Sequence, residues 1–493
     1  MRLTGSTEAN SSRAPATQAP FARVAPLLGT ALLLGVFGGF LMATVLTVTR
    51  ALDVRTGLWW IALAQAHGHL QLYGWAGLFV LGVAFHFLPR LRGSPLAYPA
   101  AARWILLALT LGLIARAVAQ PLLAGSGGAS GAGSGVWRLL LVASGVLELL
   151  ALCGAVALLL ATARNGPRMA TRPALWSVLP FLAGVCAALT LAALSNLVNV
   201  WRAASSSTGL VPGAGDSVNI TLGLFGFLVP MALAMSARAM PMYAGLTAFP
   251  ARWLWPLAFA YFSGLALACI GAGQGGLSAT WANALYGVGL AVMGAVVILF
   301  VGVFVRLMRT RGRLPERVRS LSPAPAASER AYQTKVTQEK GAYGPFVAII
   351  ASAYMWAAFG GLLLLIDGVS LAIGSYAPFA VDAARHSFAV GFIALLICGI
   401  APRMLPGFSG GRIVSPALVR ATLWLGNGAA LLRVGAVLLA QPLASLGDAG
   451  ATLDSVIFGL SGPFGLALAI CLAVNLWPAL QGGASPQVGS QRA

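Results

Sequence analysis

Long apolar stretches alternate with short polar connections along almost the whole chain. A helix needs about 20 consecutive apolar residues to cross the hydrocarbon core of a bilayer, and twelve stretches reach that length. They cover residues 25–49, 59–88, 103–123, 138–163, 174–201, 218–242, 253–273, 280–308, 344–367, 381–406, 417–440 and 455–478. The pattern therefore predicts an all-α polytopic membrane protein with about twelve transmembrane helices.

Composition supports this prediction and excludes other classes. Of the 493 residues, 59% are hydrophobic and only 9% are charged, and the mean hydropathy is +0.86. About a quarter of the residues of a soluble domain are charged, so a water-soluble globule is excluded. The net charge of +20 comes mainly from arginines in short loops, without the basic stripe of a nucleic-acid-binding protein. The five cysteines form no CxxC pair, which argues against a disulfide framework or a zinc or iron–sulfur site.

The distribution of arginines predicts the orientation in the membrane. They gather in the connections that follow the even-numbered helices, above all in the polar linker 309–342. By the positive-inside rule both termini are cytoplasmic, in a multi-pass protein of the bacterial inner membrane. Residues 1–24 are rich in Ser, Ala and Pro and are expected to form a disordered cytoplasmic tail. The first apolar stretch is too long for a signal peptide and is expected to stay as an anchor.

An internal repeat organises the chain. Residues 69–89 and 386–406 both fit His-x4-Gly-x7-Gly-x3-[His/Arg]-x2-Pro, and residues 221–241 form a third copy with Thr221 in place of the histidine. On the following helix, Arg116 and Arg433 match at the same spacing, whereas the middle copy has a leucine. We therefore predict three four-helix units. They cover 25–165, 173–308 (degenerate) and 343–480, with the basic cytoplasmic linker 309–342 between the last two and a cytoplasmic tail over 481–493.

The four histidines, at positions 67, 69, 86 and 386, are the candidates for chemistry. His69 and His386 are equivalent in the repeat and lie 17 residues before the cytoplasmic motif position, which is about 25 Å along a helix. Two such imidazoles at matching depth predict bis-histidine ligation of one haem b; the alternative is two hydrogen-bonded core histidines. His67 lies about 200° round the helix from His69 and cannot share that haem. It is a candidate for a second metal, for a propionate contact or for a lumen-facing position, and His86 is expected to be interfacial and solvated.

Polar neighbours could complete the site. Gln65 and Asp382 precede the two histidines by four residues and could orient each ring through its other nitrogen. Arg116 and Arg433 could each hold a haem propionate, or could snorkel to the headgroups. Glu148 is the only acid well inside a helix, and could act in a proton relay, as the ion-pair partner of Arg116 or as a structural group.

A soft-metal site is a further candidate. Asn196 and Asn199 on the fifth helix and four methionines around the sixth could bind copper, although methionine is more often a packing residue.

The arrangement resembles subunit I of the haem–copper oxidase superfamily, which has twelve helices and haem-ligating histidines on helices 2 and 10. That resemblance implies that His69 and His386 ligate a low-spin haem. The dinuclear centre of that family needs further histidines on helices 6, 7 and 10, and here the sixth offers Thr221, the seventh none and the tenth only His386. A classical terminal oxidase is therefore not expected, and any enzymatic activity stays open.

The chain is more similar to the NnrS family of haem-containing bacterial membrane proteins, which are linked to nitric oxide metabolism and nitrosative stress. One motif of that family is matched by His67, His69, Gly74, Trp75, Ala76 and Gly77, and a second by Arg385, His386, Val390, Gly391 and Arg403. Leu70 replaces a glutamate of the family, so proton chemistry assigned to that glutamate does not transfer. The resemblance implies haem and copper as cofactors.

The preferred hypothesis is a haem-binding membrane protein of the nitric oxide response or of electron transfer. Its expected partners are lipid, haem, and nitric oxide or a redox partner. The alternative is a membrane transporter or chaperone for haem or copper that uses the same histidines transiently. No nucleic acid is expected, and the sequence does not fix the oligomeric state.

Overall fold

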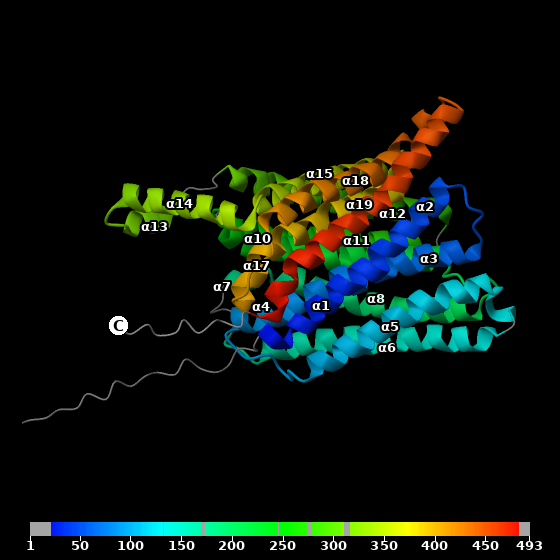
Figure 1. Ribbon diagram of the computed structural model, residues 1–493, viewed down its shortest axis with the longest axis horizontal. Coiled ribbons are helices and arrows are strands. Elements are labelled where there is room, and N and C mark those ends of the chain that lie inside the picture. Colours follow the sequence, from blue (N-terminus) through cyan, green and yellow to red (C-terminus); the bar gives the residue numbers. More distant parts are fainter. Residues whose placement is uncertain are drawn as a thin grey trace, which may run out of the picture.

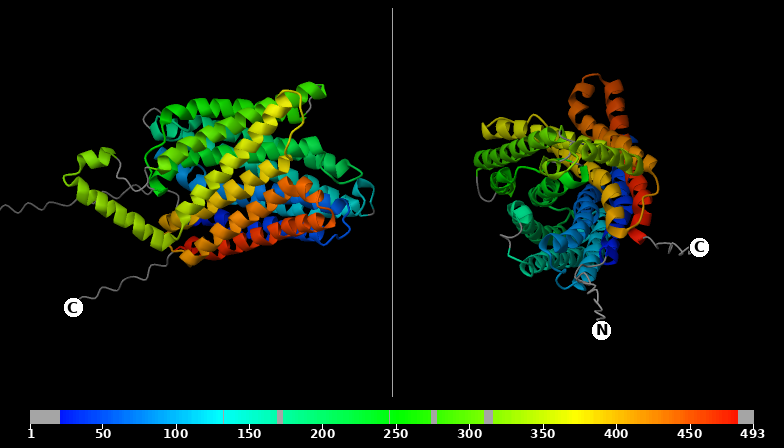
Figure 2. Two further views of the ribbon diagram at one scale, coloured as in Figure 1. Left: turned by 90° about the horizontal axis from the view of Figure 1, so that it is seen from above. Right: turned by 90° about the vertical axis from the view of Figure 1, so that its left-hand side faces the viewer.

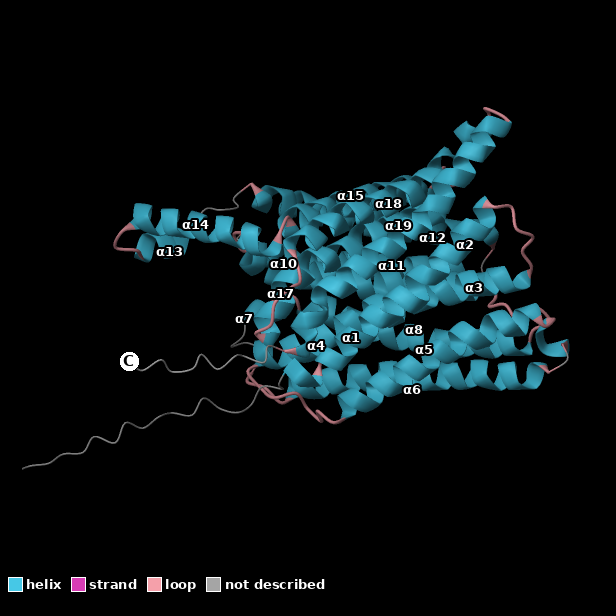
Figure 3. Ribbon diagram, viewed as in Figure 1, coloured by secondary structure: helices cyan, strands magenta, loops and turns pink. Residues whose placement is uncertain are grey.

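The computed structural model describes residues 21–131, 133–168, 173–244, 246–273, 278–309 and 316–482. Within these ranges the chain is helical and contains no strand (Figure 3). The predicted tails lie outside the described residues, except for residues 21–24 and 481–482. The predicted all-α class is confirmed.

Within the described ranges, twelve helices are long and apolar enough to cross a membrane, as predicted. Their arrangement can be followed in Figure 1. Four of the spans consist of more than one element. The spans are Ala25–Ala51 (α1 Ala25–Leu34, η2 Gly35–Phe40, α2 Leu41–Ala51), Leu58–Arg92 (α3 Leu58–His69, η3 Leu70–Gly77, α4 Leu78–Arg92), α5 Ala101–Gly125, α6 Ser134–Arg164, α8 Leu179–Ser205, Gly213–Pro241 (α9 Gly213–Ile220, η6 Thr221–Leu228, and α10, which runs over Val229–Ala244), α11 Ala251–Gly273, α12 Ala279–Met308, α15 Phe346–Ala372, Val381–Ser409 (α16 Val381–His386, η7 Ser387–Ala394, α17 Leu395–Ser409), α18 Pro416–Ala444 and α19 Asp448–Gln481.

The fifth span begins later than the apolar pattern predicts. A short separate helix, α7 (Pro173–Trp176), precedes it, and α8 starts at Leu179 with Pro180 in its first turn. Proline is favoured there because it fixes a helical φ and needs no hydrogen-bond acceptor for its nitrogen. The proline, rather than the hydrophobic pattern, sets this boundary.

The polar linker is helical over most of its described length. Helices α13 (Glu316–Leu321) and α14 (Pro325–Tyr343) project beyond one end of the bundle (Figures 1 and 2). An ion pair of 2.8 Å between Arg403 and Glu339 joins α14 to α17. We call this the linker end of the bundle.

The three spans that carry the repeated motif form the centre of the protein. Between 72% and 83% of their apolar windows is buried, against 28–50% for the other nine spans. Each contains an eight-residue π-helical segment, η3, η6 or η7, and η6 contacts both of the others. π-helical turns are rare in proteins, and those that occur are often found at functional sites. Their recurrence in the three central spans therefore makes this region a candidate functional site. The division into three four-helix units stays a prediction.

The remaining spans pack around this centre. Helix α19 lies against α18 and also against α2, so the last span meets the first (Figure 2). Helices α12 and α15 lie side by side, and a Cβ at Gly294 would come within 2.5 Å of the carbonyl oxygen of Gly361. Such close approach through small residues is typical of helix packing in membranes.

Candidate functional site

A cavity of about 260 Å³ lies between the first, second, sixth, tenth, eleventh and twelfth spans. Its wall is mostly apolar, and includes the rings of Phe40, Trp75 and Phe458. Five of its lining side chains can carry charge. They are His67, Asp382, Arg385, His386 and Arg433.

The imidazole of His386 is held by two neighbours. Its Nδ1 lies 3.0 Å from Oδ1 of Asp382, and because a carboxylate only accepts, Nδ1 carries the hydrogen. Arg433 donates from Nε to Nε2 of the ring at 3.3 Å, and from Nη2 to Asp382 Oδ2 at 2.5 Å. Nε2 therefore bears the lone pair, and the four-residue spacing does bring Asp382 to this ring.

His67 has the same pattern of contacts from a different partner. Its Nδ1 lies 2.8 Å from the backbone carbonyl oxygen of Gly39 in η2, which can only accept. Nε2 of His67 therefore also bears the lone pair. The approach of the two spans is tight, because a Cβ at Gly39 would lie 2.6 Å from the Gln71 side chain.

Each of these imidazoles thus has Nδ1 fixed by an acceptor and a lone pair on Nε2, which in His386 accepts from Arg433. Metal-ligating histidines usually have this arrangement, because the outer hydrogen bond fixes the tautomer and the orientation of the ring. His67 and His386 come from the second and tenth spans and line the same cavity. They are the residues of this cavity that could hold an iron or another metal ion.

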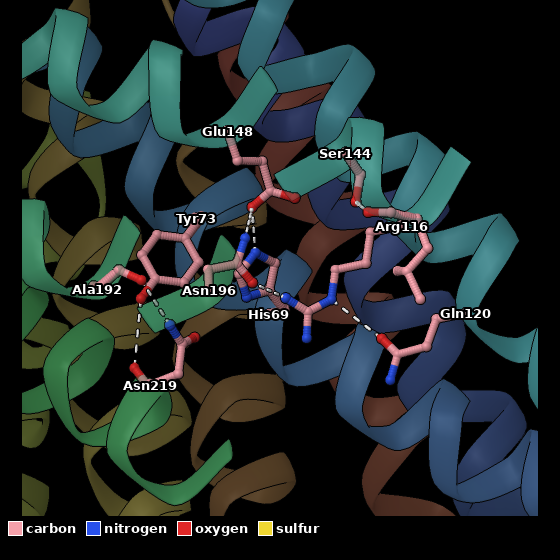
Figure 4. A network of polar contacts seen from close by, with 10 residues as sticks. His69, Tyr73, Arg116, Gln120, Ser144, Glu148, Ala192, Asn196 and Asn219 are labelled. Carbon is pink, nitrogen blue, oxygen red and sulfur yellow. Dashed lines mark hydrogen bonds and ion pairs between the residues drawn. The ribbon is translucent and has the colours of Figure 1, made fainter. Parts of the chain in front are cut away.

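His69 lies in a separate buried network (Figure 4). Its Nε2 is hydrogen-bonded to the Glu148 carboxylate of α6, which also accepts from Asn196 Nδ2 at 3.1 Å. Asn196 in turn accepts from Arg116, whose Nε donates to Gln120 Oε1 at 3.2 Å. The amide of Asn196 therefore bridges the guanidinium and the carboxylate; a direct ion pair was one of the three roles that the sequence left open for Glu148.

Gln65 extends this network toward the connection before α9. Its Oε1 accepts from Gln120 Nε2 at 2.7 Å and from the backbone nitrogen of Val211 at 3.0 Å, and its Nε2 donates to the Val211 carbonyl at 2.9 Å. The residue expected to orient the ring of His69 thus ties the second span to the third and to a loop.

The structure sorts the predicted site residues into two groups. His67, His386, Asp382 and Arg433 meet at the cavity, whereas the other predicted residues, His69, Arg116 and Gln65, belong to the network. His67 and His69 face different neighbours because two residues turn a helix by about 200°. Both are on the predicted helix, and the sequence could not show which of them shares a cavity with His386.

The cavity favours an anionic ligand. Two arginines and one aspartate line it, which gives a net charge of +1 when the histidines are neutral. Arg385, which sequence reasoning noted only as a motif residue, donates to Ser217 at 3.0 Å. The Phe458 ring lies between Arg433 and Arg50, whose guanidinium carbons are 4.7 and 5.0 Å from its centre. Such contacts hold arginines in place by cation–π attraction.

His86 is not in the solvated position that we expected. It is only 1% exposed, and its ring packs against Phe408 and Phe21 with centroids 4.1 and 5.8 Å away. Neither ring nitrogen has a hydrogen-bond partner within the described ranges. Aromatic rings near the linker end therefore cover this histidine, which the apolar pattern alone did not indicate.

The proposed copper cluster finds no support in the positions of its members. Asn196 belongs to the network, Asn199 donates to the Gly215 carbonyl at 2.9 Å, and Met231 and Met240 are buried in the hydrophobic core. Among the described residues, no three His, Cys, Asp or Glu side chains come together as a metal site. Two histidines are nevertheless enough for the axial positions of a haem iron. No protein-family model matches this chain, and no curated protein matches it.

Proposed function

We propose that this membrane protein binds one haem b in the cavity, where His67 and His386 would hold the iron. The observation that carries the proposal is the matched tautomer of the two imidazoles, each with Nδ1 held by an acceptor and a lone pair on Nε2. For His386, Arg433 must give up its contact with Nε2, and it keeps its second contact with Asp382.

The cavity has the chemistry of a haem pocket. A haem is a flat apolar ring with two carboxylates along one edge. Leu224, Leu228 and Ile393 offer an apolar wall, while Arg385 and Arg433 offer guanidinium groups for the carboxylates. Charge-assisted hydrogen bonds of this kind are strong and directional. The side chains present therefore match the ring and its acid groups in polarity and charge.

A haem bound between two histidines supplies one-electron transfer. Asp382 and the Gly39 carbonyl keep the hydrogens of His386 and His67 on Nδ1, and so aim Nε2 and raise its basicity. The resemblance to the NnrS family favours a role in the response to nitric oxide or in electron transfer. The pairing of the second and tenth spans is the one that the likeness to oxidase subunit I implies.

The ligand on the second span is proposed as His67 because His67 lines the cavity and His69 does not. The Nε2 of His69 is bonded to Glu148 in a network that does not line the cavity. Ligation by His69 would require that hydrogen bond to break and the helix to turn. Ligation by His67 and ligation by His69 therefore predict opposite results in the same experiment.

The experiment is haem spectroscopy on protein purified from cells supplied with haem. We expect a stoichiometric low-spin b-type spectrum that is lost in His67→Ala and in His386→Ala and retained in His69→Gln. His86→Phe is the matched control, because it replaces a buried ring near the linker end by another ring. The absence of haem from the wild-type protein, or its retention in both alanine variants, would refute the proposal.

A further inference from the structure

Gly68 lies on α3 between the two histidines of the second span and lines the cavity. Apart from its two chain neighbours and the backbone of its own helix, a Cβ built on Gly68 would meet no atom within 4 Å. The nearby glycines of the first span differ, because a Cβ at Gly35 or Gly38 would come within 2.1 or 2.2 Å of a neighbouring side chain. Close packing of helices therefore accounts for those glycines and does not account for Gly68.

The backbone does not require a glycine at this position either. Gly68 is inside a helix and is not among the glycines with a positive φ. An alanine would be the better helix former, since glycine loses more conformational freedom on folding. Neither packing nor conformation explains why the wall of the cavity has no side chain at this point.

The repeat shows what stands at the matching positions. Ile220 and Arg385 correspond to Gly68 in the other two central spans, and both line the same cavity. One turn further along, Leu72, Leu224 and Ala389 correspond to one another and line it as well. Equivalent faces of the three central helices thus converge on the cavity, and on the second span the position next to His67 is bare backbone.

We propose that Gly68 determines the size of the ligand that the cavity accepts, because it leaves beside His67 the room that a flat ring needs. This inference rests on the proposed haem function and names a specificity-determining residue for it. A side chain at position 68 would project into the cavity next to the proposed ligand, while both histidines and their hydrogen bonds to Gly39 and Asp382 would remain.

The test compares Gly68→Ala and Gly68→Leu with the wild-type protein in two measurements. One is the affinity for haem, by titration of the haem-free protein; the other is the thermal stability of the haem-free protein. We expect Gly68→Ala to raise the melting temperature and to weaken haem binding, and Gly68→Leu to weaken binding roughly tenfold or more, as overpacking does. A merely structural role for Gly68 would not combine higher stability with weaker binding.

Gly302→Leu is the matched control. Gly302 is also helical, and a Cβ built on it would meet no atom within 4 Å, but it is exposed on α12 and does not line the cavity. The haem affinity of this variant should equal that of the wild type. Unchanged affinity in both Gly68 variants would overturn the inference and leave the haem proposal standing, whereas a wild-type protein without haem would overturn both. If Gly68→Leu does not fold, Gly68→Ala decides the question.

Discussion

Removing the Glu148 carboxylate should destabilise the protein without abolishing the proposed binding of haem. Glu148 is fully buried, and its Oε2 accepts hydrogen bonds from His69 and Asn196. Hydrogen bonds between helices in membranes contribute about 0.6 kcal/mol on average and up to about 1.7 kcal/mol, so the two bonds account for roughly 1–3 kcal/mol. A buried donor that loses its acceptor costs a further ~1–3 kcal/mol.

We therefore expect Glu148→Ala to lower the free energy of unfolding by about 2–6 kcal/mol, which is a factor of roughly 30 to 25,000 in the equilibrium constant. Glu148→Gln keeps an acceptor oxygen for Asn196 and nearly the same shape, so its loss should stay below about 1 kcal/mol. The assay is unfolding in mixed micelles, titrated with a denaturing detergent and followed by tryptophan fluorescence.

Two results would refute this reasoning. If Glu148→Ala cost no more than Glu148→Gln, the network would not stabilise the contact between the second, fourth and fifth spans. If Glu148→Gln lost the low-spin haem spectrum at unchanged stability, the contact with His69 would serve an iron ligand directly. Ligation would then belong to His69 and not to His67.

Three further outcomes are expected. Asp382→Ala should weaken haem binding by about 10–100-fold, as loss of an outer hydrogen bond to a metal ligand does, and an unchanged affinity in haem titration would contradict its orienting role. Arg433→Leu should weaken binding of haem but not of haem dimethyl ester, whose carboxylates are blocked; equal losses for the two ligands would show that Arg433 does not hold a propionate. Glu339→Ala removes the ion pair between α14 and Arg403, which is partly exposed and contributes at most ~1 kcal/mol. Trypsin should therefore cut α14 up to about fivefold faster in this variant. An unchanged rate of cleavage would mean that this ion pair does not hold α14 against the bundle.

The twelve spans could be predicted because the thickness of a bilayer sets the length of an apolar helix. The helices of the linker could not be found in this way, since α14 has no fully buried residue and is too polar to span a bilayer. The start of the fifth span depends on Pro180, and this boundary does not show in the hydropathy pattern because the residues around it are apolar.

The candidate site could be predicted only in part. The repeat singled out His386, Asp382 and Arg433 together, because residues four apart share a helix face and the arginine recurs on the following helix. The repeat also favoured His69 over His67. A repeat shows which positions along the chain are equivalent, but it does not show which residues pack against them in the fold. Glu148 lies 79 residues further along, and no local pattern indicates that it engages His69.

The number of residues in a π-helical segment determines which of the side chains before it face the cavity. Because η3 follows directly after His69, deleting one residue within it would turn the part of the span before η3 by about 100° relative to the part after it. His67 would then take the place of Gly68, and Ala66 the place of His67. A single codon lost from or added to this segment could thus change which side chain meets the ligand, with no change in the side chains themselves.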